Sequence, residues 1–336
     1  MTQNKRVLSL FTGAMGLDLG LERHGLKTVL AVEYDKHARA TIKANRPDVM
    51  VMDDVFSVTP ADMVASRGPF DVICGGPPCQ SWSYAGNRKG MEDQRGLCIP
   101  RFLDIVEAIL PNTVIMENVL GLTTASIDGV KGAVISLVTD RLTSFGYKVS
   151  SSIVNSADFG SPQCRKRIVF IATMDGRRTD LQPTHSQEWL NDLPKWRTLR
   201  DSIIDTPPSQ CAKYPKSQFK YITLLKSGQN WRNLPLELQK EAMGGAFEGE
   251  GGRTSYFRRL SWDKPAPTLV CCPTQKSTCL CHPDEDRPLN VKEYARIQGF
   301  PDDWTFCGPL AAQYKQIGNA VPVQLAEAIG QAINVV

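Results

Sequence analysis

Short apolar runs alternate with segments of helical periodicity through the first half of the chain. The apolar runs, which are rich in β-branched residues and leucine, lie at residues 5–11, 28–32, 49–52, 70–74, 113–116, 145–154 and 168–171. Apolar spacing, together with glycine and proline positions, predicts helices at residues 17–24, 36–45 and 100–110. Strands that alternate with helices in this way are typical of an α/β fold built on a mostly parallel sheet.

The pattern changes after about residue 175. Prolines interrupt it repeatedly, at Pro183, Pro194, Pro207, Pro208 and Pro215. Residues 244–252 add five glycines, and we predict a small separate domain of short strands and long loops at residues 176–309. From residue 311 the chain reads as a loop that leads into a helix at about residues 322–333. This helix would return to the first domain, which would then comprise residues 1–175 and 310–336.

Composition narrows the class of protein. The chain has 336 residues, of which 42% are hydrophobic and 22% are charged, as in an ordinary soluble globular protein. A net charge of +4 is too small to indicate a polyanion partner, so a basic surface would require local clustering. The 10 cysteines are irregularly spaced, which does not suit a disulfide framework. No apolar stretch approaches the ~18 residues of a membrane span, and the first residues lack a signal peptide, so we expect a cytoplasmic protein.

A glycine-rich turn separates the first predicted strand from the first helix. Gly13 and Gly16 lie in it, and such a turn places a ligand at the amino end of the helix. The second strand ends in Glu33, which suits hydrogen bonds to ribose hydroxyls, although a solvated strand end is the alternative. Tyr34 would stack on an adenine. Asp54, after the third strand, would accept a hydrogen bond from an exocyclic amine.

A stiff loop follows the fourth strand. Gly75 and Gly76 allow a sharp turn, and Pro77 and Pro78 restrict the backbone just before Cys79. A thiol on a rigid loop at the carboxyl end of a strand lies where open α/β sheets carry their chemistry. A free cysteine can equally pack as a small apolar residue, and the loop alone does not decide between a nucleophile and a buried thiol.

Further candidate groups lie beyond this loop. Residues 81–96 are polar, with aromatic and cationic side chains, and we predict a mobile functional lid that contacts nucleic acid. Glu117 and Asn118 end the fifth strand and would lie beside the cysteine loop. Arg165 and Arg167 are two residues apart, so they share one face at the entrance of an apolar strand. Such a pair favours contact with an anion or a carboxylate.

Seven segments of the chain resemble, in order, the motifs of the DNA (cytosine-5)-methyltransferase family. The matching segments are residues 11–17, 33–35, 78–81, 117–119, 163–167, 287–301 and 316–321. The chain departs from the family at three positions, where Ser9 replaces an acidic residue, Met15 a glycine and Cys98 a leucine. The resemblance covers nearly the whole chain except about residues 175–286.

The resemblance implies a Rossmann-like, S-adenosylmethionine-dependent methyltransferase domain with a smaller, mostly β/loop target-recognition domain. It implies that Cys79 attacks C6 of a flipped-out cytosine, which activates C5 for methylation. Glu117 would stabilise a protonated N3 and hold the 4-amino group, while Arg165 would brace the base. Arg167 and Asn118 complete the catalytic set that the resemblance implies.

It also implies binding sites for the cofactor and for DNA. The residues expected to bind S-adenosylmethionine, and S-adenosylhomocysteine as product, are Phe11, Gly13, Ala14, Gly16, Leu17, Glu33, Tyr34, Asp54, Val55, Gly76, Pro78, Asn319, Ala320 and Val321. Those expected to contact DNA are Gln80, Ser81, Ser83, Arg88, Arg95, Gln163, Arg253, Arg258, Arg259 and Thr268. A merely solvated cation is the alternative for each arginine of the small domain.

Several alternatives remain open from the sequence. The same chemistry on RNA is one, and a DNA-binding protein that keeps the fold without catalysis is another. Cys271, Cys272, Cys279, Cys281 and His282 supply enough ligands for zinc, but their spacing is not that of a familiar zinc finger, so we expect loop or packed thiols. We expect a bacterial monomer that acts on double-stranded DNA, and a cognate restriction endonuclease could share its site without binding it.

Overall fold

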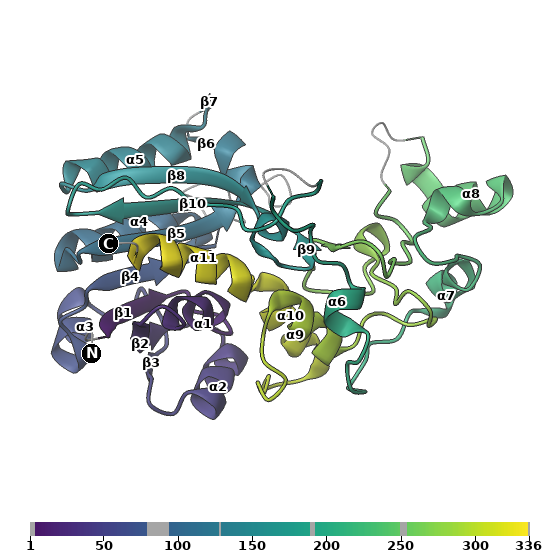
Figure 1. Ribbon diagram of the computed structural model, residues 1–336, viewed down its shortest axis with the longest axis horizontal. Coiled ribbons are helices and arrows are strands. Elements are labelled where there is room, and N and C mark those ends of the chain that lie inside the picture. The colour runs from purple at the N-terminus through teal and green to yellow at the C-terminus, as the bar shows by residue number, and fades with distance from the viewer. Residues whose placement is uncertain (1–3, 79–93, 128, 189–191, 249–253, 335–336) are drawn as a thin grey trace.

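The computed structural model describes residues 4–78, 94–127, 129–188, 192–248 and 254–334. A seven-stranded sheet forms its centre, in the order β3-β2-β1-β4-β5-β10-β8 (Figure 1). The strands are β1 (Lys5–Leu10), β2 (Leu26–Val32), β3 (Met50–Met52), β4 (Val72–Gly75), β5 (Thr113–Val119), β8 (Lys148–Asn155) and β10 (Lys166–Thr173). The first five are mutually parallel, whereas β10 is antiparallel to both β5 and β8. The predicted α/β fold with a mostly parallel sheet is confirmed.

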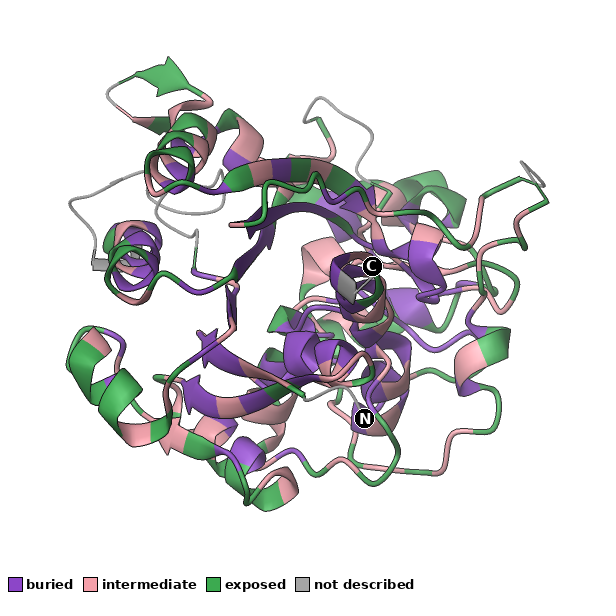
Figure 2. Ribbon diagram, turned by 60° about the vertical axis from the view of Figure 1, so that its left-hand side comes forward, coloured by how far each residue is buried: buried purple, intermediate pink, exposed green. Residues whose placement is uncertain are grey.

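Helices cover both faces of this sheet, because alternate residues of each buried strand face opposite sides. Ile73 of β4 packs in the cluster that includes α3 (Pro60–Arg67), α4 (Cys98–Ile109) and α5 (Ala133–Ser144). Its neighbours Val72 and Cys74 pack in the cluster of α1 (Gly16–Glu22) and α11 (Val323–Asn334). The strands are accordingly buried between helices whose outer faces are exposed (Figure 2).

The end of the chain packs directly on its beginning, as predicted, and glycines make the contact possible. A Cβ atom at Gly20 of α1 would lie 2.4 Å from the carbonyl oxygen of Val323 and 2.5 Å from Cβ of Ala326, both in α11. At Gly16 a Cβ atom would lie 2.4 Å from the carbonyl oxygen of Val321. The first glycine turn and the segment before α11 are therefore in backbone contact.

The region after residue 175 is rich in loops, as predicted, but contains helices where we expected strands. Its helices are α6 (Arg200–Ile203), α7 (Lys216–Ile222), α8 (Leu236–Met243) and α9 (Val291–Gln298). Asn290 and Glu293 form a capping box at the start of α9, and Asp35 caps α2 (Lys36–Asn45) of the first domain. Among its described residues the one named strand is β11 (Ala266–Pro267), which pairs with β9 (Gln163–Cys164). Pro215 and Pro235 are the N-cap residues just before α7 and α8, where a residue without an N–H leaves no donor unpaired.

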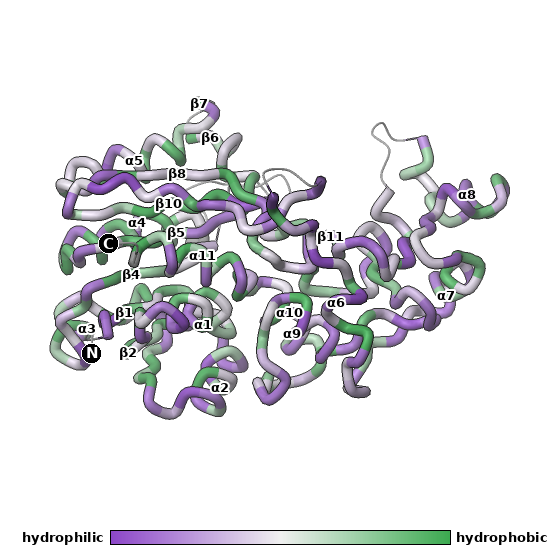
Figure 3. Tube along the Cα trace, in the orientation of Figure 1, coloured by the Kyte–Doolittle hydropathy of each residue, from purple (hydrophilic) through white to green (hydrophobic). Residues whose placement is uncertain are grey.

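These short helices bury one side in a local core. Hydrophobic and hydrophilic residues alternate along α7 and α8 (Figure 3). Tyr221 of α7 and Met243 of α8 pack in one cluster with Trp231 and Phe257. The region thus has its own hydrophobic centre, separate from the clusters on the two faces of the sheet.

The predicted loop at residues 311–321 is instead a helix, α10 (Leu310–Asn319). Tyr314 and Ile317 are buried at helical spacing, and Gln316 is buried between them. The Gln316 side chain accepts a hydrogen bond from Thr41 Oγ1 (2.6 Å) and donates one to the Cys307 carbonyl (2.8 Å). These bonds satisfy a polar residue inside a buried helix, where we had predicted a loop. Among the described helices, none is long and apolar enough to cross a membrane.

We predict that Gly20→Ala destabilises the protein by about 2 kcal/mol. Alanine normally stabilises a helix interior relative to glycine by roughly 0.5–1 kcal/mol, but here the added carbon would overlap the α11 backbone, which has little room to shift. Urea unfolding measures the difference. Gly245→Ala is the matched control, because a Cβ atom there meets nothing within 4 Å. Equal effects of the two substitutions would contradict the close-packing explanation.

Candidate active site at the carboxyl edge of the sheet

The glycine-rich turn and the end of β2 are joined by a carboxylate. Glu33 Oε2 accepts a hydrogen bond from the Gly13 N–H (2.7 Å), and its Oε1 accepts one from the Asp35 N–H (2.7 Å). Burial raises the pKa of Glu33, and these two backbone hydrogen bonds oppose the shift. The Tyr34 ring beside it is 78% exposed. A carboxylate acceptor and an open aromatic face therefore lie together at the predicted cofactor turn.

The turn itself uses left-handed backbone conformations. Phe11, Gly13 and Met15 have φ values of 55°, 59° and 68°. Met15 occupies the position where the family commonly has glycine, and its conformation is one that glycine adopts at little cost. Its side chain is fully buried against Ala31 and Ile42. Packing thus offsets the backbone cost of a non-glycine residue here.

The remaining cofactor candidates surround this turn in different ways. Ala14 and Leu17 are buried in hydrophobic clusters, which suits support of the turn better than direct contact with a ligand. Asp54 uses Oδ1 to accept the Phe56 N–H (3.0 Å), and the buried Val55 offers its carbonyl to Arg101 (3.0 Å). The candidates at the other end of the chain lie before α11, where Asn319 is exposed and Ala320 and Val321 are buried.

The loop that leads to Cys79 is tied to the end of β5. Asn118 Nδ2 donates a hydrogen bond to the Pro77 carbonyl over 2.9 Å. A Cβ atom at Gly76 would lie 3.3 Å from Oε2 of Glu117, so the absence of a side chain there lets the loop approach this carboxylate. Pro78 is exposed at the end of the described loop. The predicted neighbourhood of this loop and the Glu117–Asn118 pair is thus present in the structure.

Two arginines converge on Glu117 from the β9–β10 segment. Arg167 Nε lies 2.7 Å from Glu117 Oε1, and both side chains are largely buried. Arg165 donates a hydrogen bond from Nη1 to the Leu269 carbonyl (3.2 Å), while its Nε has no hydrogen-bond partner among the described residues. Burial, and secondarily the charge of Arg167, lower the pKa of Arg165 to about 9. A buried arginine whose Nε–H has no protein acceptor is suited to donate a hydrogen bond to a ligand.

Some of the predicted residues lie outside the part of the chain that the structure describes. These are Cys79, Gln80, Ser81, Ser83, Arg88 and Arg253, together with the side chain of Arg95. The predicted lid at residues 81–96 falls mostly in the same gap, and its last residues form a 3-10 helix at Gln94–Leu97.

Two of the predicted DNA contacts have structural positions instead. Gln163 is fully buried and bonds the side chain of Gln298 and the backbone of Leu269. Arg259 is 4% exposed, forms an ion pair with Asp286, and donates further hydrogen bonds to backbone carbonyls within the small region. We therefore withdraw both as DNA contacts, because both side chains are buried and the hydrogen bonds that they form go to protein groups.

The other two described candidates are less enclosed. Arg258 is half-buried, burial lowers its pKa, and its Nε donates to the Thr254 carbonyl at 3.4 Å. Thr268 is also half-buried and donates from Oγ1 to the Cys164 carbonyl over 3.0 Å. The spacing of charges in the sequence did not distinguish Arg258 from Arg259, because adjacent residues look alike until the local backbone direction is known.

The cysteines near residue 280 separate into two environments. Cys271 and Cys272 are exposed, and the Cys271 thiol donates a hydrogen bond to Asn319 Oδ1 at 2.9 Å. Cys279 and Cys281 are buried, and burial raises the pKa of Cys281 to about 12. Within the described ranges, no group of three or more His, Cys, Asp or Glu side chains is arranged to hold a metal ion.

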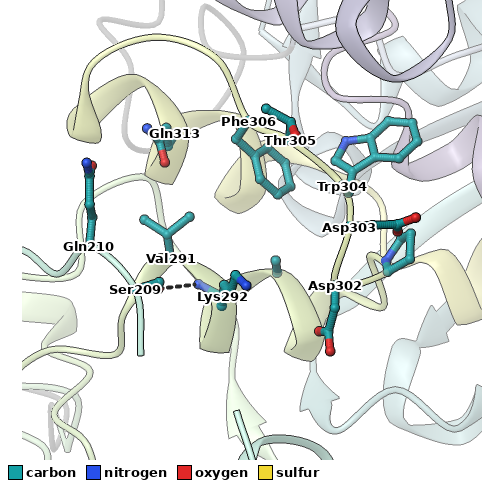
Figure 4. Close-up of a pocket in the computed structure, with 12 residues that line it drawn as sticks. Ser209, Gln210, Val291, Lys292, Asp302, Asp303, Trp304, Thr305, Phe306 and Gln313 are labelled. Carbon is teal, nitrogen blue, oxygen red and sulfur yellow. Dashed lines mark hydrogen bonds between the residues drawn. The ribbon is translucent and has the colours of Figure 1, made fainter. Parts of the chain in front are cut away.

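A separate surface cavity of ≈ 370 Å³ lies beside α9 (Figure 4). Trp304 and Phe306 line it, together with the charged residues Lys292, Asp302 and Asp303. None of the predicted catalytic, cofactor or DNA residues borders it. The groups that could support chemistry gather instead at the carboxyl edge of the sheet.

A family model described as C-5 cytosine-specific DNA methylase matches residues 5–335. The chain belongs to this family. It is thus a DNA (cytosine-5)-methyltransferase by class, and the resemblance first noted from its motifs is confirmed.

Curated relatives of this methylase extend over almost its whole length. It is 42% identical over 335 residues to the type II methyltransferase M.Eco47II of Escherichia coli, an alignment that covers 97% of this chain and 78% of that protein. It is 39% identical to the type II methyltransferase M.Sau96I of Staphylococcus aureus, with 97% and 75% of the two chains covered.

Solved structures share the fold of this methylase. The S. pombe Dnmt2 methyltransferase superimposes with a TM-score of 0.64 at 19% identity, covering 98% of both chains. The Entamoeba histolytica methyltransferase EhMeth gives a TM-score of 0.63 at 16% identity, covering 99% of this chain and 98% of that one. These likenesses support the predicted methyltransferase fold.

One buried carboxylate of the methylase fold was not anticipated from the sequence. Asp18, in the first turn of α1, is fully buried, and its Oδ1 accepts a hydrogen bond from Thr28 Oγ1 (2.7 Å). Its Oδ2 has no hydrogen-bond partner among the described residues, and burial raises the pKa of Asp18 to about 6. In the unfolded chain an aspartate titrates near pH ~3.9.

We predict that Asp18→Asn stabilises the protein at pH 8. The folded state binds the Asp18 proton more tightly than the unfolded chain does. Protonated Asp18 therefore contributes to stability in full below pH ~4, and this contribution is lost as the pH rises through about 6. Removing the buried charge should therefore add up to about 3 kcal/mol at pH 8 and less at pH 5. Urea unfolding at both pH values measures it, with the exposed Asp53→Asn as control. An advantage that does not change with pH would contradict this origin.

We predict opposite consequences for two adjacent arginines. Arg259→Ala should lower the free energy of unfolding by about 3 kcal/mol, because Asp286 and several carbonyls lose a buried partner. Arg258→Ala should leave stability nearly unchanged. If its guanidinium contacts phosphate, the substitution should reduce the slope of log Kd for duplex DNA against log salt concentration by about one. Thermal unfolding and salt-dependent anisotropy titrations distinguish them. A large stability loss in Arg258→Ala would reverse the assignment.

Proposed function

We propose that the chain transfers a methyl group from S-adenosylmethionine to C5 of a cytosine flipped out of a specific double-stranded DNA sequence, through a covalent bond between Cys79 and C6. The observation that carries this proposal is the buried Glu117, which is held by Arg167 and lies against the loop that leads to Cys79. A carboxylate next to a loop-borne thiol is the pair that activation of a cytosine ring requires.

The residues would divide the chemistry as follows. The Cys79 thiolate adds to C6, and the electron pair displaced from the C5–C6 bond makes C5 nucleophilic, while the Glu117 carboxylate stabilises a protonated N3. Arg167 orients the Glu117 carboxylate, and Arg165 offers its unused donor to the base. The cofactor supplies an electrophilic methyl group. Loss of the C5 proton to a base then expels the Cys79 thiolate, and N3 gives up its added proton, which restores the aromatic ring.

The cofactor would lie between the glycine turn and the segment before α11. Glu33 would exchange one backbone hydrogen bond for the ribose hydroxyls, and Tyr34 would cover the adenine with its exposed ring. Asp54 would accept from the adenine amine. Asn319 is exposed beside this turn and would close the pocket. These residues fit an adenosyl group because they combine a buried hydrogen-bond acceptor, an open aromatic face and backbone N–H groups.

We further propose a division of labour within the chain. Residues 1–175 and 310–336 form the catalytic and cofactor-binding domain, and residues 176–309 recognise the DNA target. The names of the relatives suggest a role in a type II restriction–modification system, with a restriction endonuclease acting on the same sequence. We propose that the enzyme acts as a monomer, since one chain carries every group that the reaction requires.

The decisive experiment expresses the protein in a bacterial host that lacks cytosine-5 methylation. Bisulfite sequencing of a plasmid from these cells should show methylated cytosines in one short sequence, which also identifies the target. Purified protein should transfer labelled methyl groups to that duplex, and a duplex with 5-fluorocytosine at the target should trap a covalent complex. Methylation at another ring position, or on RNA alone, would contradict the proposal.

We predict that Cys79→Ala lowers methyl transfer by at least about 10⁴-fold, because no other group can form the C6 bond. Its affinity for S-adenosylhomocysteine, measured by calorimetry, should stay within about twofold of the parent protein. Cys98→Ala is the control for loss of a thiol elsewhere, and it should keep the 5-fluorocytosine complex. Undiminished transfer by Cys79→Ala would exclude the covalent mechanism.

A further inference from the structure

Two buried glutamines connect parts of the site that are far apart in the sequence. Gln163 lies in β9 and Gln298 is the last residue of α9, and both are fully buried. Gln163 Nε2 donates a hydrogen bond to Gln298 Oε1 over 2.7 Å. Each side chain also binds the backbone of another segment, so the pair forms a continuous chain of hydrogen bonds.

The Gln298 end of this chain holds the segment proposed to close the cofactor pocket. Gln298 Nε2 donates to the carbonyls of Ile317 (2.6 Å) and Ala320 (2.9 Å). The Ile317 carbonyl also accepts a hydrogen bond from the Ala320 N–H (3.2 Å), so Gln298 adds a side-chain cap to the backbone bond that ends α10. The next residue, Val321, presses its carbonyl against Gly16 in the glycine turn.

The Gln163 end holds a segment from the proposed recognition domain. Gln163 Oε1 accepts a hydrogen bond from the Leu269 N–H (2.9 Å), and the Leu269 carbonyl accepts from Arg165 (3.2 Å). The Leu269 residue is therefore held on both sides by groups of the β9–β10 entrance. The following residues, Val270 and Cys271, pack their backbone against Gly318 at the end of α10.

We propose that the Gln163–Gln298 pair positions these two segments jointly, so that the cofactor and duplex DNA strengthen each other's binding. This inference rests on the proposed function, because it assumes that the cofactor binds beside Ala320 and that DNA contacts the segment around Leu269. Neither amide can turn without leaving buried polar groups unpaired, which makes the pair a stiff connection. Linkage requires the effect to be equal in both directions.

A purely structural role is the alternative, and α10 offers a matched control. Gln316 is also a buried glutamine, but its amide binds Thr41 and the Cys307 carbonyl, on the side of α10 that faces α2. Replacing it should cost comparable stability without touching the chain from Leu269 to Ala320. Gln163 and Gln298 are positioning residues in this scheme, since their amides act through the segments that they hold.

The test measures the Kd of a labelled duplex that carries the target sequence mapped by bisulfite sequencing, with and without S-adenosylhomocysteine. For the parent protein, the Kd without S-adenosylhomocysteine should be about tenfold higher than the Kd with it, and we call this quotient the ratio. It should fall below about twofold for Gln298→Met and for Gln163→Asn, which shortens the side chain by one methylene and keeps its chemistry. Gln316→Met should retain the parent ratio.

The outcomes separate this inference from the proposed function. A parent ratio near one, or the same ratio in all four proteins, overturns the inference, as does an equal loss in Gln316→Met. If Gln298→Met does not fold, Gln163→Asn decides alone. A parent protein that binds neither S-adenosylhomocysteine nor the duplex would instead contradict the proposed function.

Discussion

A buried ion pair between Glu117 and Arg167 constrains the whole carboxyl edge of the sheet. Burying either charge alone would cost several kcal/mol, so each side chain must find the other as the strands assemble. Glu117 lies near the end of β5 and Arg167 near the start of β10, and these two positions meet only if the strands run in opposite directions. The reversal of β10 in an otherwise parallel region is thus what brings an arginine to a carboxylate at this edge.

The same edge draws on distant parts of the chain. The loop before Cys79 is fixed by Asn118, and the glycine turn after β1 is fixed by Glu33. The turn in turn contacts the segment before α11, where Gly16 leaves room for a carbonyl. Each of these contacts involves backbone atoms, which move less freely than side chains. A site assembled in this way keeps its geometry before any ligand arrives.

The small region after residue 175 shows how burial separates similar residues. Arg258 and Arg259 are neighbours, yet one is half-buried with a long contact to Thr254 and the other is enclosed by Asp286 and carbonyl groups. A cation that already binds protein acceptors has little to offer to phosphate. The charges available to DNA are therefore fewer than the sequence suggests, and their arrangement follows from the local core around Phe257.

The sequence by itself determined the strands, the glycine turn, and the motifs that identify the family. These depend on local periodicity and on residue types that few other arrangements require. Only the tertiary structure decided that residues 310–319 form a helix, since its buried polar Gln316 finds partners on α2 and at Cys307. The structure likewise decided that Gln163, which we expected to contact DNA, binds Gln298. A polar side chain carries no mark of whether water or a distant segment will satisfy it, because that partner is chosen only when the chain has folded.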